Sequence, residues 1–256
     1  MLSRKREIEL SELAETIAEL YCPSEIVLPE HIATMKGITF SNGDYGSAFD
    51  GLIEFENGSF HIFVNTKLDG DLRQARPRFT FAHELGHYFI DEHRQALLNG
   101  RTPSHPSYTN FASKNPIEIE ADHFAASLLL PASRVKKDCV KRSFNFSLVQ
   151  DISQKYGASI TATVLRLMTI DKHPIMLVCS VQGKVKWFKH SHDFPFKWLK
   201  QPFGYVPKYT LAGTYFKNGE KFAEELPISA NEWFEYVSDR DLSRNFWDYR
   251  INCVNF

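Results

Sequence analysis

The sequence predicts an α+β fold, with a helix-rich first part and a smaller mixed part after residue 171. Apolar residues recur at helical spacing in residues 7–22, 76–93 and 117–130. Residues 49–68 alternate β-branched and aromatic residues around Asn57-Gly58, the pattern of a β-hairpin. After residue 171 the chain becomes dense in aromatic residues, which indicates a change of domain.

The first elements follow from local signals. Residues 7–22 form an amphipathic helix that ends before Pro23, and residues 28–40 form a short helix, ended by Gly37, and then a strand. Residues 76–93 form a helix with Pro77 in its first turn, where the missing N–H costs nothing. Residues 59–65, the second strand of the hairpin, are either an edge strand that holds an extended substrate or a core strand.

The later elements are read in the same way. Residues 95–116 are rich in Pro, Ser, Thr and Asn and read as a long loop. Residues 117–130 form a second strong helix, ended by Pro131. Residues 146–168 read as two short helices joined around Gly157, and residues 174–190 as a hairpin that turns at Gln182-Gly183.

Composition excludes several classes of protein. The 256 residues carry a net charge of -1, so we do not expect a bulk basic surface for nucleic acid. No apolar run is long enough to span a membrane, and the charged N-terminus lacks a secretory signal, which predicts a cytoplasmic protein. The four cysteines are scattered without a C-x-x-C pair, so we expect them to be reduced and structural.

The pattern H-E-x-x-H occurs at residues 83–87, inside a predicted helix. Residues i and i+4 share a helix face, so His83 and His87 can present two imidazoles to one zinc ion, while Glu84 can take a proton from a water molecule there. The alternative is a pair of ordinary surface histidines. Apolar neighbours that would bury the motif favour the metal site.

Two positions compete for the third ligand. His93 has the spacing of the metzincin motif, but that motif needs a glycine three residues after the second histidine, and Ile90 stands there. Without this turn, His93 would lie about 240° around the helix from His87 and face away from the metal. We therefore expect His93 to be a polar residue near the C-terminus of the helix.

A glutamate on the second helix is the preferred third ligand. Glu118 and Asp122 stand at i and i+4, so one can ligate the metal while the other fixes the tautomer of a ligating imidazole. We assign Glu118 as the ligand and Asp122 as the residue behind the imidazole, the alternative for Asp122 being a plain surface carboxylate. Glu120 is rotated about 160° from Asp122 and is expected to be a solvated charge.

These motifs resemble the ImmA/IrrE metallo-endopeptidases, through residues 49–65, 78–89 and 118–131. The resemblance implies a minimal thermolysin-like zincin, in which a small sheet packs on the H-E-x-x-H helix and on a second, glutamate-bearing helix. It implies the zinc ligands His83, His87 and Glu118, and Glu84 as general acid/base. We accordingly expect a zinc metallopeptidase domain at 1–140, a helix-turn-helix-like extension at 141–171 and a C-terminal domain of unknown role at 172–256.

The resemblance also implies a function. Members of the family cleave helix-turn-helix repressors in stress or mobile-element responses, so we expect a zinc-dependent endopeptidase with such a protein as substrate. Tyr88, His105 and Tyr108 are the candidates for a donor to the oxyanion. The alternative is a DNA-binding or ligand-sensing regulator without proteolysis. Residues 146–168 have a helix-turn-helix outline, but a neutral overall charge favours helices that simply cap the peptidase domain.

Overall fold

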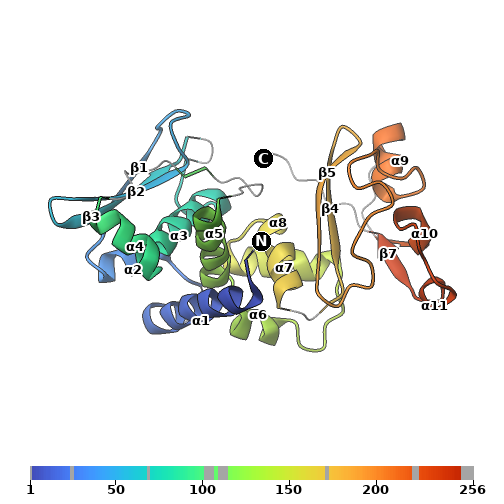
Figure 1. Ribbon diagram of the computed structural model, residues 1–256, viewed down its shortest axis with the longest axis horizontal. Coiled ribbons are helices and arrows are strands. Elements are labelled where there is room, and N and C mark those ends of the chain that lie inside the picture. Colours follow the sequence, from blue (N-terminus) through green and yellow to red (C-terminus); the bar gives the residue numbers. More distant parts are fainter. Residues whose placement is uncertain are drawn as a thin grey trace. The chain divides into compact units, whose positions relative to one another are not determined.

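The computed structural model describes residues 2–23, 26–67, 70–100, 107–108, 115–170, 173–220 and 225–248 (Figure 1). It is a mixed α+β protein with small sheets, as predicted. Contacts divide the chain into two compact units. Unit 1 contains residues 1–140 and 151–163, and unit 2 contains residues 141–150 and 164–256. The predicted three-domain division stays a prediction.

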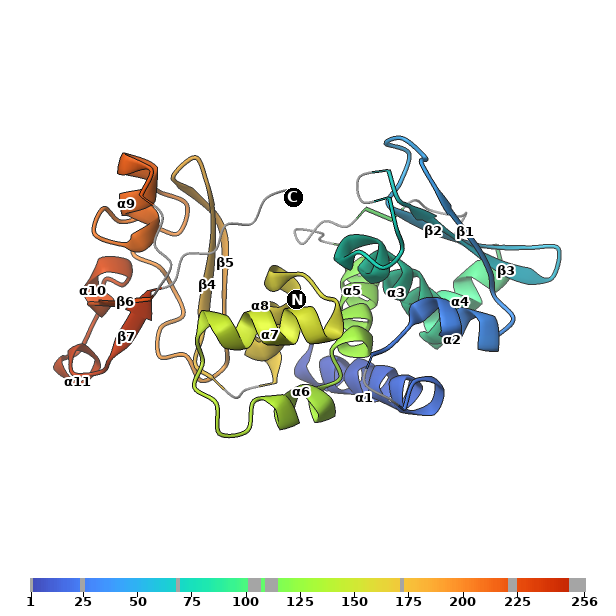
Figure 2. The ribbon, with the colours of Figure 1, turned by 180° about the vertical axis from the view of Figure 1, so that it is seen from behind.

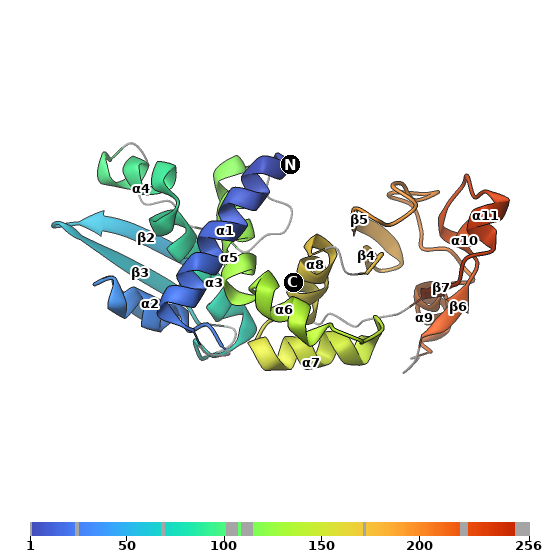
Figure 3. The same ribbon diagram turned by 90° about the horizontal axis from the view of Figure 1, so that it is seen from below.

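Unit 1 opens with two helices whose ends follow local sequence signals. In α1 (Arg4–Tyr21) the side chain of Ser3 accepts a hydrogen bond from the backbone N–H of Arg6, which caps the helix. Its apolar face is buried, and α1 runs beside α5 (Pro116–Leu129), as Figure 3 shows. Helix α2 (Pro29–Met35) starts on a proline, and Gly37 leaves it with a φ of 69°.

The sheet of unit 1 has three strands, β1 (Thr39–Gly43), β2 (Gly51–Glu56) and β3 (Ser59–Asn65), in the order β1-β3-β2. Strands β2 and β3 form the predicted hairpin, with positive φ at Asn57 and Gly58. Strand β3 also pairs in parallel with β1, so it is the central strand. The edge-strand reading of residues 59–65 is therefore wrong, and β2 lies at an edge instead.

The predicted helix over residues 76–93 is two helices, α3 (Ala75–Phe89) and α4 (Asp91–Leu98), seen together in Figure 2. Ile90 separates them with extended dihedral angles, φ -75° and ψ 113°, and its side chain is buried. Asp91 and Glu92 then occupy the first turn of α4, where negative charge is favourable. The prediction missed this restart, and it also assigned the last turn of α4 to a loop.

Helices α6, α7 and α8 come next after α5. Helix α6 (Ala132–Asp138) was not predicted from the sequence. Helices α7 (Phe146–Tyr156) and α8 (Ile160–Thr169) meet around Gly157, whose φ is 60°, as expected from the sequence. Residues 151–163 belong to unit 1, and there the buried guanidinium of Arg78 donates hydrogen bonds to the carbonyls of Val27 and Tyr156.

Unit 2 is built on an aromatic core. The predicted hairpin is β4 (Met176–Val181) and β5 (Lys184–His190), with positive φ at both turn residues. It is followed by α9 (Leu211–Asn218), β6 (Leu226–Ile228), α10 (Ala230–Trp233), α11 (Asp239–Leu242) and β7 (Phe246–Asp248). The rings of Phe196 and Phe234 stack with centroids 4.2 Å apart in the core.

Two expectations from composition can be compared with the structure. Among the described residues, no helix is long and apolar enough to cross a membrane. Cys22, Cys139 and Cys179 are free thiols, as predicted, and Cys253 lies outside the described residues.

Candidate metal centre

The two histidines of the H-E-x-x-H motif converge on one face of α3. Their Nε2 atoms lie 3.1 Å apart, and both side chains are buried. This follows from the four-residue spacing, which turns the helix by about 40° and so leaves both rings on the same side. The helix thus brings two imidazole nitrogens to one point.

Glu118 reaches the same point from the first turn of α5. Its Oε2 atom lies 3.2 Å from Nε2 of His83, and its Oε1 atom lies 3.6 Å from Nε2 of His87. The ligand atoms of the three side chains all lie within 4.8 Å of one another, so the group could hold a metal ion. Tetrahedral ligands at zinc distances are about 3.3 Å apart, and the closest contacts among the three side chains are of this order.

Asp122 stands behind the first of these rings. Its Oδ1 atom lies 2.9 Å from Nδ1 of His83, and the imidazole N–H donates to the carboxylate. This bond leaves Nε2 facing Glu118 as the ligating nitrogen. Burial alone would lower the pKa of His83, but the hydrogen bonds with Asp122 and Glu118 raise it to about 10 in the metal-free protein. The site therefore carries enough negative charge to hold a cation.

Small residues allow the two helices to come close enough for this arrangement. A Cβ atom at Gly86 would lie 3.2 Å from Cα of Ala121 and 3.2 Å from Cδ1 of Phe124. Such contacts are tighter than ordinary packing, so a larger residue at position 86 would push α5 away from α3. The glycine inside the H-E-x-x-H motif thus sets the distance between Glu118 and the histidines.

Glu84 is fully buried beside the metal-binding group, on the side of the sheet. A Cβ atom at Gly51, the first residue of β2, would overlap Oε1 of Glu84 and Cγ2 of Thr80. The edge strand therefore passes directly over the carboxylate, and only glycine fits there. The backbone of Gly51 also exchanges hydrogen bonds with that of Ser107. Neither Gly51 nor Ser107 was predicted from the sequence to have a role at the site.

The second face of α5 carries a different group. Glu120 accepts a hydrogen bond of 2.6 Å from Arg6 and lies 3.3 Å from Nε2 of His93. It is largely buried, so the expectation of a solvated charge is wrong. Arg6 belongs to α1, more than a hundred residues away in sequence, so no local sequence pattern predicts its contact with Glu120.

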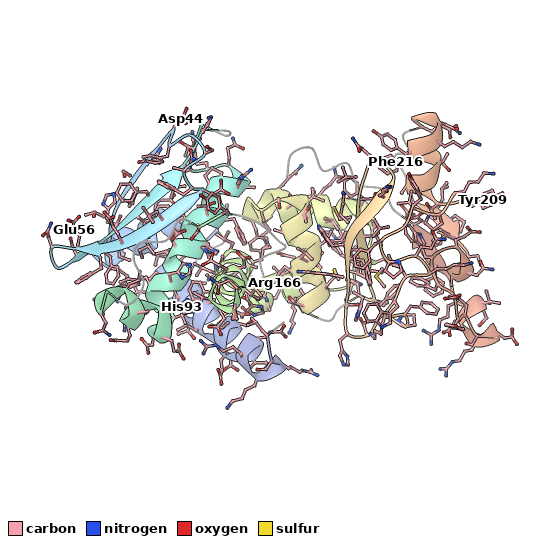
Figure 4. The ribbon with its side chains drawn as sticks, turned by 45° about the horizontal axis from the view of Figure 1, so that its top comes forward. Asp44, Glu56, His93, Arg166, Tyr209 and Phe216 are labelled. Atoms are coloured by element: carbon pink, nitrogen blue, oxygen red, sulfur yellow. The ribbon has the colours of Figure 1, made fainter. Side chains whose placement is uncertain are left out.

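His93 also departs from its expected position. It lies in α4, labelled in Figure 4, and its ring is 5.2 Å from that of His87 instead of on the opposite side of one long helix. Burial is the main cause that lowers its pKa, with the charge of Arg6 acting in the same direction. Among the described residues, the metal-binding group consists of His83, His87 and Glu118 without His93.

The described contacts of Tyr88 and Tyr108, two candidates for an oxyanion donor, are with residues other than the metal-binding group. The ring of Tyr88 packs edge-on against Phe60 and Phe89. The hydroxyl of Tyr108 donates to the carbonyl of Ala48, 2.7 Å away. His105 lies outside the described residues.

A cavity of about 340 Å³ opens beside His87. Apolar residues of α4 and of the start of α5 line one part of it, and a charged cluster lines the rest. Its lining residues are Arg6, His87, Glu92, His93, Ala96, Leu97, Pro116, Ile117 and Glu120. The cavity adjoins a candidate metal ligand, so a side chain bound in it would lie next to the ion.

Comparisons with known proteins show what this chain resembles. Residues 61–168 match the peptidase M78 family model, described as the IrrE N-terminal-like domain, and this range includes every predicted site residue. A solved structure of a Mycobacterium tuberculosis transcriptional regulator is similar over 87% of this chain and 65% of that one, with 13% sequence identity and a TM-score of 0.57. This chain therefore spans less than two thirds of that structure's length, and the likeness concerns the fold. A search of the curated proteins gives no match.

Proposed function

Residues 61–168 carry an IrrE N-terminal-like domain of the M78 peptidases, and from this premise we propose that the chain is a zinc-dependent endopeptidase. The observation that carries the proposal is the convergence of His83, His87 and Glu118 within 4.8 Å, with Glu84 buried beside them. Two histidines and one glutamate are the donor set of zinc peptidases, and three protein ligands leave a coordination position for the reaction.

The ion, when bound, supplies a Lewis acid that acidifies water and polarises the scissile carbonyl. The chain supplies the remaining functions. Glu84 accepts the proton of the attacking water and passes it to the leaving amine, because its carboxylate adjoins the histidine pair. Asp122 holds the ring of His83 in the ligating tautomer. The complete burial of Glu84 excludes bulk water from its carboxylate and strengthens its interaction with nearby charge.

The substrate strand is proposed to pair with β2. This strand lies at the edge of the sheet, and its first residue, Gly51, packs against Glu84. Because the backbone of Gly51 already pairs with Ser107, the substrate strand would pair with the residues of β2 that follow Gly51. An extended peptide bound to a sheet edge gains main-chain hydrogen bonds whatever its sequence. The cavity beside His87 is then the place for one of its side chains, and its mixed lining favours an apolar residue with a polar end.

The substrate itself is proposed to be a helix-turn-helix transcriptional repressor, cleaved in a stress or mobile-element response in the cytoplasm. The resemblance of residues 49–65, 78–89 and 118–131 to the ImmA/IrrE peptidases supports this choice. A repressor encoded next to this protein would be the first candidate to examine.

The test is co-expression with candidate repressors, followed by a search for specific fragments. The zinc-loaded wild type is expected to release them, while Glu84→Gln keeps zinc and fold but loses hydrolysis, because an amide cannot accept the proton. Undiminished cleavage by Glu84→Gln would remove Glu84 as the base. Stoichiometric zinc without cleavage of any candidate would favour the alternative, a regulator that uses the zincin fold only for binding.

A further inference from the structure

Residues 176–219 of unit 2 have a charge that the whole-chain average conceals. They contain seven lysines and one aspartate, a formal charge of +6 in a chain whose net charge is -1. All seven lysines are exposed, and none forms an ion pair with another residue in the described part of the chain. The lysines are Lys184, Lys186, Lys189, Lys197, Lys200, Lys208 and Lys217. A surface of this kind attracts a polyanion.

The same residues expose flat aromatic rings. Five of the eight exposed aromatic side chains in the described residues fall between 176 and 219. They are Trp198, Phe203, Tyr205, Tyr209 and Phe216, between 40% and 75% exposed. The core of unit 2 is itself aromatic, so these rings are the part of the aromatic content that the core does not use.

Several of these groups gather at the turn of the β4–β5 hairpin. A Cβ atom at Gly183 would lie 3.6 Å from the ring of Phe216 and 3.7 Å from that of Tyr205, so both rings flank the turn. Backbone pairing between Lys184 and Tyr205 fixes this arrangement. The ammonium group of Lys184 lies 5.2 Å from the centre of the Tyr205 ring.

A second lysine lies beside a tyrosine ring a few residues after Tyr205. The ammonium group of Lys208 lies 5.2 Å from the centre of the Tyr209 ring, just before α9. Figure 4 labels Phe216 and Tyr209 in the C-terminal part of the chain. We use the name turn surface for Lys184, Tyr205 and Phe216, which flank the turn, together with the pair Lys208 and Tyr209, which lies in the chain between Tyr205 and α9. It combines exposed rings with cations placed beside them.

We propose that the turn surface binds single-stranded nucleic acid. Bases stack on exposed rings and phosphates contact the lysines, which is how sequence-tolerant single-strand binding works. A duplex fits less well, because its bases are already stacked and cannot reach the rings. An acidic protein would satisfy the lysines but offers no regular series of flat faces. The proposal does not depend on the peptidase activity, and the neutral charge of the whole chain does not oppose it.

The test is fluorescence anisotropy of fluorescein-labelled dT20 and rU20 with the full-length protein at low and moderate salt. We expect binding of at least one of the two single strands, weaker binding of a duplex of equal length, and an affinity that falls with salt. Tyr205→Ala and Tyr209→Ala should each weaken binding by roughly 5- to 100-fold, the usual effect of losing one stacking ring. Lys184→Gln should also lower the salt dependence.

Two controls keep the proposal falsifiable. Tyr236→Ala removes an aromatic side chain that is 88% exposed but lies outside residues 176–219, and it should bind like the wild type. Thermal unfolding shows whether each variant is folded. Binding of neither dT20 nor rU20 would overturn the proposal. So would a Tyr205→Ala variant that is folded and binds normally, or a polyglutamate that competes as well as dT20, since either result indicates a purely electrostatic or acidic-protein surface.

Discussion

Two histidine–glutamate groups lie next to each other in unit 1, and their described contacts differ. The first contains His83, His87 and Glu118, and its ligand atoms face one another. The second contains His93 and Glu120, but the guanidinium of Arg6 binds the same glutamate at 2.6 Å.

In the second group the arginine already supplies the positive charge that the carboxylate needs. In the first group, the hydrogen bonds of Asp122 and Glu118 hold a proton on His83 in the metal-free protein. A histidine and a glutamate in contact are therefore not enough to identify a metal site. The source of the compensating charge separates an ion pair from a site that can bind a metal ion.

The largest expected effect comes from removing a ligand of the first group. His87→Ala and Glu118→Ala should each weaken zinc binding by more than about 100-fold, because only two protein ligands remain. His93→Ala and Glu120→Ala should retain about one zinc per chain. Elemental analysis and chelator competition on all four variants provide the measurement. Loss of metal in His93→Ala, with retention in Glu118→Ala, would show that the two groups have been assigned the wrong way round.

Zinc affinity should depend on pH, because zinc competes with a proton for His83 in the first group. The pKa of His83 is raised to about 10 from the ordinary 6.5, so zinc must displace this proton at any lower pH. Zinc affinity should rise with pH, by about tenfold per unit for one displaced proton, until the pH approaches 10. Titrations with zinc at several pH values between about 6 and 8 measure this slope. An affinity independent of pH would mean that His83 is already neutral there.

The raised pKa of His83 gives the stability of the metal-free protein a pH dependence opposite to that of zinc affinity. A histidine that binds its proton more tightly when folded stabilises the folded state, fully so below the unfolded pKa of about 6.5. This contribution is lost as the pH rises towards 10. Urea unfolding of the metal-free protein at several pH values should therefore show this contribution decreasing while zinc affinity increases.

Asp122→Asn should have an intermediate effect. An asparagine keeps the shape but loses the charge that orients the ring of His83, and changes of this kind weaken metal binding by roughly 10- to 100-fold. Glu120→Gln is the matched control on the same helix and should bind zinc within about twofold of the wild type. Equal weakening in both variants would contradict the division of α5 into two faces.

The smallest effect is expected on the stability of the second group. Glu120→Gln loses the charged bond to Arg6, which is partly exposed to solvent, and should lower the free energy of unfolding by about 1 kcal/mol. Glu92→Gln, whose side chain is 68% exposed, should cost less than about 0.5 kcal/mol. Urea unfolding of the zinc-loaded protein measures both. A larger loss for Glu92→Gln than for Glu120→Gln would show that Glu92, and not Glu120, forms the main ion pair with Arg6.

Each half of the first group was predictable from helix periodicity, while the meeting of α3 and α5 depends on packing between the two helices. His83 with His87, and Glu118 with Asp122, are each four residues apart on a helix, so their shared faces follow from helix geometry. The second group was not predictable, since Arg6 arrives from a distant helix. His93 was misplaced because a single residue, Ile90, interrupts the helix without a proline or glycine to mark the break.

The sheet was predictable to a similar extent. Asn57-Gly58 determined the hairpin, because positive φ at both positions requires such residues. The order of the strands depends on pairing between β1 and β3, which are distant in sequence, and no local pattern encodes it. The edge strand over Glu84 could therefore be identified only in the folded structure.

Because residues 151–163 belong to unit 1, this unit is not a continuous stretch of the chain, which affects how it can be exchanged between genes. The guanidinium of Arg78 on α3 donates hydrogen bonds to two carbonyls, and one of them, that of Tyr156, belongs to this later segment. A gene fragment that ended at residue 140 would leave this buried cation with fewer acceptors. A fragment that keeps unit 1 whole therefore extends to residue 163 and includes residues 141–150, which belong to the other unit.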